Sequence, residues 1–116
     1  MSPMCYSQSM EDLITIEYYI LENGKSPYVE WEADLPKDIR AQVRKRLNRV
    51  RLGNFGDCSH IEGSLYELRM HVGPGYRIYY GKKNQKLVIL ICAGSKRGQQ
   101  RDIEKAKKFW LEGSFK

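Results

Sequence analysis

Apolar and polar positions alternate with different periods along the chain, and these periods predict its first elements. Residues 13–21 are rich in β-branched and aromatic side chains, which favours a strand, and Asn23-Gly24 closes it. Ser26 followed by Pro27 is a favourable helix start, because serine caps the first turn and proline fits the first helical position. The apolar face of this short helix consists of Tyr28, Trp31 and Leu35.

A longer and strongly basic helix is predicted from Pro36 to about Leu52, where Gly53 suits its C-terminal cap. Its apolar residues recur at helical spacing, which places them in one buried stripe. The stripe consists of Ile39, Val43, Leu47 and Val50. Most of the other positions are cationic, namely Lys37, Arg40, Arg44, Lys45, Arg46, Arg49 and Arg51.

A β-hairpin is predicted after a loop at residues 54–64. Residues 65–72 and 76–80 both alternate, and Gly73-Pro74-Gly75 between them is a turn sequence. Because side chains alternate across a strand, the hairpin has two faces. The face expected in the core carries Tyr66, Leu68, Met70, Val72, Tyr76, Ile78 and Tyr80. The opposite face carries Glu67, Arg69, His71, Arg77 and Tyr79.

The end of the chain is predicted to form one more strand and a final helix. Residues 87–93 are the longest apolar run and should be the most buried strand. A small basic loop at residues 94–98 leads into a helix over about residues 99–111. The element order β-α-α-β-β-β-α predicts an α+β fold, in which a small sheet packs against helices.

Length and composition fit one domain. The chain has 116 residues, 41% of them hydrophobic, so it can bury a core. We expect residues 1–12 to form a flexible N-terminal tail and residues 13–116 to form a single domain. The longest apolar run is far shorter than the roughly 20 residues that cross a bilayer. Since no secretory signal is visible either, we expect a soluble cytoplasmic protein with no membrane partner.

The cysteines and histidines predict neither a metal site nor a cofactor. Cys5, Cys58 and Cys92 are odd in number and far apart, and with His60 and His71 they complete no metal-ligand spacing. We therefore expect no metal, no cofactor, and three reduced thiols.

Positive charge favours a polyanionic partner. Twenty basic against 14 acidic residues give a net charge of +6. Such a balance attracts nucleic acid, an anionic membrane or an acidic protein. Composition alone does not choose among these three.

The polar face of the hairpin carries groups suited to RNA. A three-residue turn predicts that His71 lies opposite Arg77 and that Arg69 lies opposite Tyr79. Guanidinium groups bind phosphate, a tyrosine can stack on a base, and histidine titrates near neutral pH. Cleavage of RNA by its own 2′-hydroxyl needs a proton acceptor, a proton donor and positive charge, but no metal. A solvated sheet face with no catalytic role is the equally plain alternative.

A second candidate phosphate site follows the predicted central strand. Lys96 and Arg97 lie beside glycines at the start of the last helix, where backbone N–H groups favour anions, and Arg101 extends the positive charge. Loops of this composition are also common on protein surfaces, so the motif alone is not specific.

Two motifs together resemble the RelE/ParE toxin superfamily, most closely its phage Gp49-like or HigB-type branch of addiction-module killer proteins. The first is the hairpin sequence LYELRMHVGPGYRIYY at residues 65–80. The second lies in residues 87–106, where a GSKR loop precedes the helix sequence QRDIEKA. The resemblance covers roughly residues 14–110.

This resemblance implies a microbial RNase-type fold, with a small twisted antiparallel sheet packed against two N-terminal helices and a C-terminal helix. It implies the toxin of a type II toxin–antitoxin system, usually a metal-independent endoribonuclease that cleaves mRNA on the ribosome and so inhibits translation. The implied partners are that mRNA and a cognate antitoxin, often a helix-turn-helix protein.

Carried over by position, Arg69 and Arg77 match hairpin residues that contact the scissile phosphate in RNA-cleaving members. Lys96 and Arg97 match a basic pair after the central strand. Glu67 departs from the pattern, because RelE proper has a lysine there. The tyrosine that RelE proper carries in its last helix is also absent, which leaves His71 and Tyr79 as candidate acid, base or stacking groups.

The leading hypothesis is therefore a ribosome-dependent mRNA interferase. Its predicted catalytic residues are Arg77, Arg69, His71 and Tyr79, and its predicted phosphate-binding residues are Lys96, Arg97 and Arg101. Two alternatives remain open, namely a ParE-like toxin that poisons DNA gyrase and a degenerate toxin that only binds its antitoxin.

Overall fold

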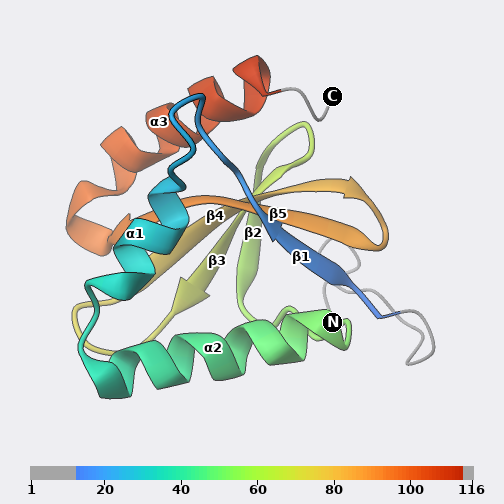
Figure 1. Cartoon of the computed structure of the whole chain (residues 1–116). Coiled ribbons are helices and arrows are strands. Elements are labelled where there is room, and N and C mark those ends of the chain that lie inside the picture. The colour runs from blue at the N-terminus through green and yellow to red at the C-terminus, as the bar shows by residue number, and fades with distance from the viewer. Residues whose placement is uncertain (1–12, 114–116) are drawn as a thin grey trace.

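The computed structural model describes residues 13–113, which form a five-stranded sheet and three α-helices (Figure 1). The expected tail at residues 1–12 lies outside the described residues. The elements are β1 (Thr15–Tyr18), α1 (Pro27–Ala33), α2 (Lys37–Arg51), β2 (Cys58–Glu62), β3 (Leu65–Met70), β4 (Tyr76–Asn84), β5 (Leu87–Ser95), the short 3-10 helix η1 (Lys96–Gly98) and α3 (Gln99–Glu112). The predicted α+β class and all three predicted α-helices are confirmed.

The sheet is mixed and not purely antiparallel. Its strand order is β1-β5-β4-β3-β2, and β1 pairs with β5 in parallel, with Thr15 opposite Leu87. The other pairs are antiparallel. The expectation of an antiparallel sheet is therefore wrong for β1, because the chain crosses through α1 and α2 before the sheet continues, and such crossovers permit parallel pairing.

Strand β2 was not predicted from the sequence. Its five residues fall in the segment 54–64, which was expected to be a loop, and they form the edge next to β3. The segment shows no hydrophobic alternation in its sequence. As an edge strand it has one neighbouring strand, and its side chains are only partly buried or exposed. Its pairing with β3 is irregular between His60 and Glu62.

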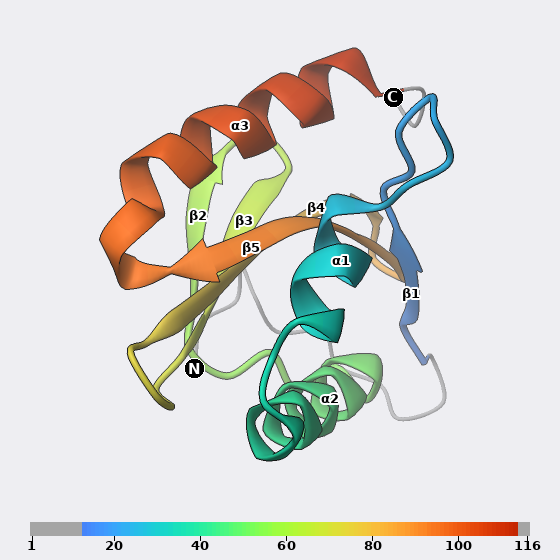
Figure 2. The same ribbon diagram turned by 60° about the vertical axis from the view of Figure 1, so that its left-hand side comes forward.

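Helices cover both faces of the sheet (Figure 2). On one face, α1 and α2 enclose a core that contains Val43, Leu68 and Leu90. On the other face, α3 packs over a second core that contains Tyr79, Ile91 and Ala106. Strand β5 is buried on both faces, which confirms that residues 87–93 form the most buried strand.

Local sequence determines where α1 begins and how its end is satisfied. Ser26 accepts a hydrogen bond from the Val29 backbone N–H through its side chain, and Pro27 occupies the first turn, as predicted. The Arg40 guanidinium, from α2, donates to the backbone carbonyls of Glu32, Ala33 and Leu35. This arginine therefore caps carbonyls at the end of α1 that have no partner within the helix.

The hairpin faces are predicted correctly, but the register differs. In the structure Arg69 lies opposite Arg77, and Glu67 lies opposite Tyr79. The predicted pairs are therefore offset by two residues, because the connection between β3 and β4 spans five residues, from His71 to Gly75. A two-residue offset keeps every side chain on its predicted face.

Two glycines allow α3 to lie close against the sheet. A Cβ at Gly81 would overlap the Trp110 ring, and a Cβ at Gly94 would overlap the Asp102 carboxylate. Trp110 also donates a hydrogen bond to the Ser64 hydroxyl, at 3.0 Å. These contacts fix the height and the orientation of α3 above the hairpin.

The cysteines differ from the sequence expectation. Cys92 is a free thiol buried beneath α3. Cys58 is disulfide-bonded, so the expectation of three reduced thiols is wrong.

Candidate functional site

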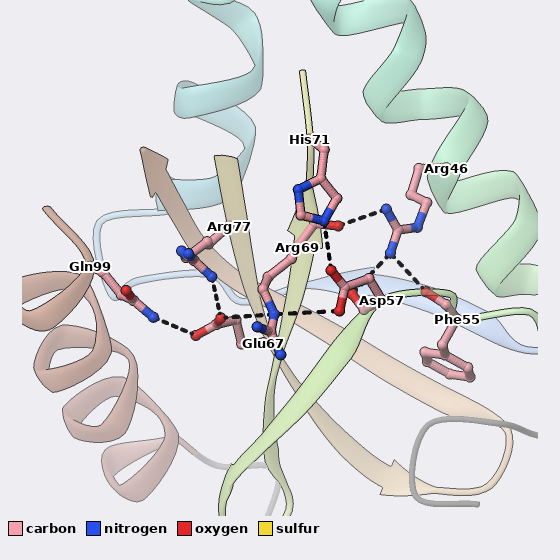
Figure 3. A network of polar contacts seen from close by, with 8 residues as sticks. All are labelled: Arg46, Phe55, Asp57, Glu67, Arg69, His71, Arg77 and Gln99. Carbon is pink, nitrogen blue, oxygen red and sulfur yellow. Dashed lines mark hydrogen bonds and ion pairs between the residues drawn. The ribbon is translucent and has the colours of Figure 1, made fainter. Parts of the chain in front are cut away.

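The candidate site lies on the hairpin face that α3 partly covers, where Arg69 and Arg77 are direct cross-strand neighbours. Two guanidinium groups on adjacent strands repel one another unless an anion lies between them. The chain itself supplies that anion through Glu67, which lies on β3 two residues before Arg69 and on the same face (Figure 3).

Glu67 is the centre of a buried polar cluster. Arg77 donates to its Oε2 at 2.7 Å, and Gln99, at the start of α3, donates to its Oε1 at 3.2 Å. Arg69 Nε lies 3.6 Å from Oε2. The side chains of Glu67 and Arg77 are only 5% and 13% exposed, so their charges interact with little screening by water.

Asp57 links this cluster to His71. The Asp57 carboxylate lies 2.7 Å from His71 Nε2 and 3.5 Å from Arg69 Nε. The hydrogen bond with His71 is the main reason that the pKa of Asp57 lies below its ordinary value. His71 is itself 77% exposed, so a ligand can reach its ring from solvent.

Arg46 holds the backbone around Asp57 in place. From α2 its guanidinium donates to the carbonyls of Arg69, Phe55 and Asp57, at distances of 2.8, 3.0 and 3.0 Å. Burial is the main cause that lowers the pKa of Arg46, and nearby Arg49 lowers it further. The three carbonyls make Arg46 an anchor between α2 and the hairpin, with few donors left for a ligand.

Tyr79 faces the site from below and is not accessible. Its exposed fraction is 0%, and its hydroxyl has no hydrogen-bond partner among the described residues. Burial is the main cause that raises its pKa, and the negative charge of Glu67 adds to the effect. In this position the ring packs against α3 and does not offer a surface on which a base could stack.

The three predicted phosphate-binding residues lie apart from the buried cluster. Lys96 and Arg97 are exposed in η1, and Arg101 is exposed on the first turn of α3. In the part of the chain that the structure describes, none of the three forms a salt bridge or a side-chain hydrogen bond. Lys96 is nevertheless joined to the hairpin turn, because its backbone N–H donates to the Gly75 carbonyl at 2.8 Å.

The structure thus brings Arg69, Arg77, His71 and Tyr79 to one region and places the exposed cations at its end near the hairpin turn. Sequence reasoning did not find Asp57, because it lies in a segment expected to be a loop. The contact between Gln99 and Glu67 was not predicted either, because it depends on how α3 docks.

The described residues contain neither a metal-ligand cluster nor a membrane-spanning helix. Within residues 13–113 no group of three or more His, Cys, Asp or Glu side chains is arranged to hold a metal ion. None of the helices described is long and apolar enough to span a bilayer.

Comparison with known proteins gives one family match and one related protein. Residues 30–110 match the model of the family described as phage derived protein Gp49-like (DUF891). The chain is also 43% identical, over 68 residues, to an uncharacterized protein of Haemophilus influenzae. That match covers 59% of this chain and 69% of the relative.

These matches define the class as toxin-like proteins associated with toxin–antitoxin systems. The chain belongs to the Gp49-like family. The matched segment contains every candidate site residue, from Arg69 to Arg101.

Proposed function

We propose that this protein is the toxin of a type II toxin–antitoxin system, with the microbial RNase-type fold of RelE and HigB toxins, and that it cleaves ribosome-bound mRNA. The observation that carries the proposal is the direct cross-strand pairing of Arg69 and Arg77 beside the exposed His71. Membership of the Gp49-like family supports the general toxin role.

In the proposed reaction, the 2′-hydroxyl of RNA attacks the adjacent phosphorus and its proton passes to a base. The bond to the 5′-oxygen breaks, and that oxygen receives a proton. Arg77 and Arg69 stabilise the charge on the phosphate oxygens. We assign acid–base work to His71, because it is exposed and bonded to Asp57, whereas Tyr79 is buried. Tyr79 then has a packing role, because its buried ring lies opposite Glu67 on the neighbouring strand.

The cations at the end of the site would bind neighbouring phosphates. Lys96, Arg97 and Arg101 are exposed and form no salt bridge or side-chain hydrogen bond among the described residues, although the charge of Arg101 acts on neighbouring Asp102. Their positive charge can therefore attract a polyanion. The same positive surface suits a cognate antitoxin, which we propose to be a separate helix-turn-helix protein. Both partners would be met in the cytoplasm.

The proposal is tested in a reconstituted translation system in which mRNA 5′ ends are mapped by primer extension. Wild-type protein should produce new ends inside translated codons, and only when ribosomes are present. Arg77→Ala should reduce cleavage by roughly 10²–10³-fold. Because Arg77 also neutralises buried Glu67, the Arg77→Lys variant is the necessary control, since it keeps the charge but loses the planar fork. Uncut message with folded wild-type protein would contradict the proposal, and a DNA supercoiling assay would then test gyrase poisoning.

A second candidate is a degenerate toxin that binds its antitoxin without cleaving RNA. It is favoured by one observation, that the Arg77 charge is already neutralised by Glu67 and largely buried. Under this alternative, overexpression leaves growth normal while the purified chain still binds its co-encoded partner tightly.

A further inference from the structure

A second cationic groove lies outside the buried cluster, between α2 and the end of β3. It has a volume of about 250 Å³. Its lining residues are Gln42, Lys45, Arg46, Arg49, Met70, His71 and Val72. The function proposed above assigns no role to its α2 residues.

The α2 wall of this groove presents two cations, Lys45 and Arg49, that form no salt bridge with a carboxylate among the described residues. Gln42, Lys45 and Arg49 follow one another at spacings of three and four residues, so they share one face of the helix. All three are exposed. Among the described residues, neither Lys45 nor Arg49 forms a salt bridge or a side-chain hydrogen bond, whereas Arg44 on the same helix pairs with Glu32.

Arg46 and His71 connect the groove to the candidate site. Arg46 lines the groove and donates a hydrogen bond to the backbone carbonyl of Arg69, which ties α2 to β3. The charge of Arg49 disfavours the charged form of Arg46, which an anion bound between them would relieve. His71 lines the groove and also contacts Asp57, so the groove and the cluster meet at this residue.

We propose that the groove formed by Gln42, Lys45, Arg49 and His71 binds a backbone phosphate of single-stranded nucleic acid. The chemistry favours nucleic acid over an acidic protein, because the centres of protein interfaces are depleted of charge and need apolar anchors. Here the exposed rim is cationic or amide, and the apolar contribution comes from Met70 and Val72. Lysine, arginine and glutamine are common donors to phosphate.

This inference rests on the proposed function, since it adds a contact for the same RNA strand beyond the cleavage site. Such a strand would pass from the cations after β5, across Arg69 and Arg77, to the groove at His71. The groove residues would then contribute to binding along the backbone and would not depend on base sequence.

The test measures binding of a labelled single-stranded oligodeoxynucleotide, which lacks the 2′-hydroxyl and stays uncut. The Lys45→Ala/Arg49→Ala variant is compared with Lys37→Ala/Lys108→Ala, a control that also removes two exposed cations but lies outside the groove. The groove variant loses one phosphate contact, so the slope of log affinity against log salt should become shallower by about 0.7. The control should keep more of the wild-type slope.

Equal slopes for the two variants would overturn the inference. It would also be overturned if the groove variant bound the oligonucleotide as the wild type does but no longer bound a polyglutamate peptide. Thermal unfolding of both variants verifies that they fold. The binding result does not depend on cleavage, because the oligodeoxynucleotide cannot be cut. If the protein binds it through the groove but cleaves no mRNA, the inference stands and only the proposed function is contradicted.

Discussion

Gly94 on β5 and Asp102 on α3 are in direct contact, so that a single added methyl group would overlap the carboxylate. Gly94 does not have a positive φ, so alanine is tolerated by the backbone there and only the space is lacking. The contact explains how α3 comes close enough for Gln99 to reach Glu67.

Gly94→Ala should therefore destabilise the protein by roughly 1–3 kcal/mol, the usual cost of overpacking. Urea denaturation measures the change. Asp102→Gly removes the group with which the methyl would collide. Gly94→Ala should therefore cost less unfolding free energy when it is added to Asp102→Gly than when it is added to the wild type. Equal costs of Gly94→Ala in both backgrounds would show that this contact does not position α3.

Arg77 should contribute to stability as well as to the proposed chemistry. Arg77→Ala leaves the buried Glu67 carboxylate with only Gln99 and the more distant Arg69 as partners. We expect a loss near the lower end of the roughly 3–5 kcal/mol typical of broken buried pairs. Arg77→Lys should cost clearly less, since it retains a cation. Equal unfolding free energies for the two variants would contradict the central role of the ion pair.

The exposed cations should affect function without affecting stability. Lys96→Ala/Arg97→Ala removes two side chains that have no ion-pair partner among the described residues, so the free energy of unfolding should change by less than about 0.5 kcal/mol per substitution. Cleavage in the translation assay should fall by roughly tenfold or more, as expected when charge-assisted contacts to phosphate are lost. A destabilised variant, or one that cleaves at the wild-type rate, would remove these residues from the site.

Stability should fall in mildly alkaline solution because of Cys92. Burial raises the pKa of its thiol to about 12, whereas an unfolded thiol ionises near pH 8.5. The unfolded state then binds fewer protons than the folded state as pH rises above about 8.5, so the free energy of unfolding decreases there. The slope approaches about 1.4 kcal/mol per pH unit once the unfolded thiol is fully ionised. Urea titrations between pH 8 and pH 10 should show a flatter dependence for Cys92→Ala than for the wild type.

Local pattern was enough to predict the helices and the two hairpin faces. The α2 stripe of Val43, Leu47 and Val50 is buried as its spacing required. The side-chain alternation of β3 and β4 assigns each residue to a face whichever register holds, so an error of two residues in pairing left the faces intact.

The features that the sequence did not predict depend on contacts between distant segments of the chain. Parallel pairing of β1 with β5 leaves no local signal, and β2 has too little burial to show an alternation. Asp57 becomes a partner of His71 only because β2 pairs with β3. The sequence placed Glu67 on the same hairpin face as the cations but did not indicate that it pairs with Arg77. The pairing of Arg69 with Asp57 was not predicted either.

The pairing of β1 with β5 also bears on the order of events during synthesis. Tyr18 lies opposite Leu90, so β1 has no strand to join until residue 90 has been translated and has left the exit tunnel. Until then α1 and α2 lack the completed sheet that they cover. The basic α2 is therefore made before the sheet that it covers, and the hairpin site assembles only after β4 and β5 have also been made.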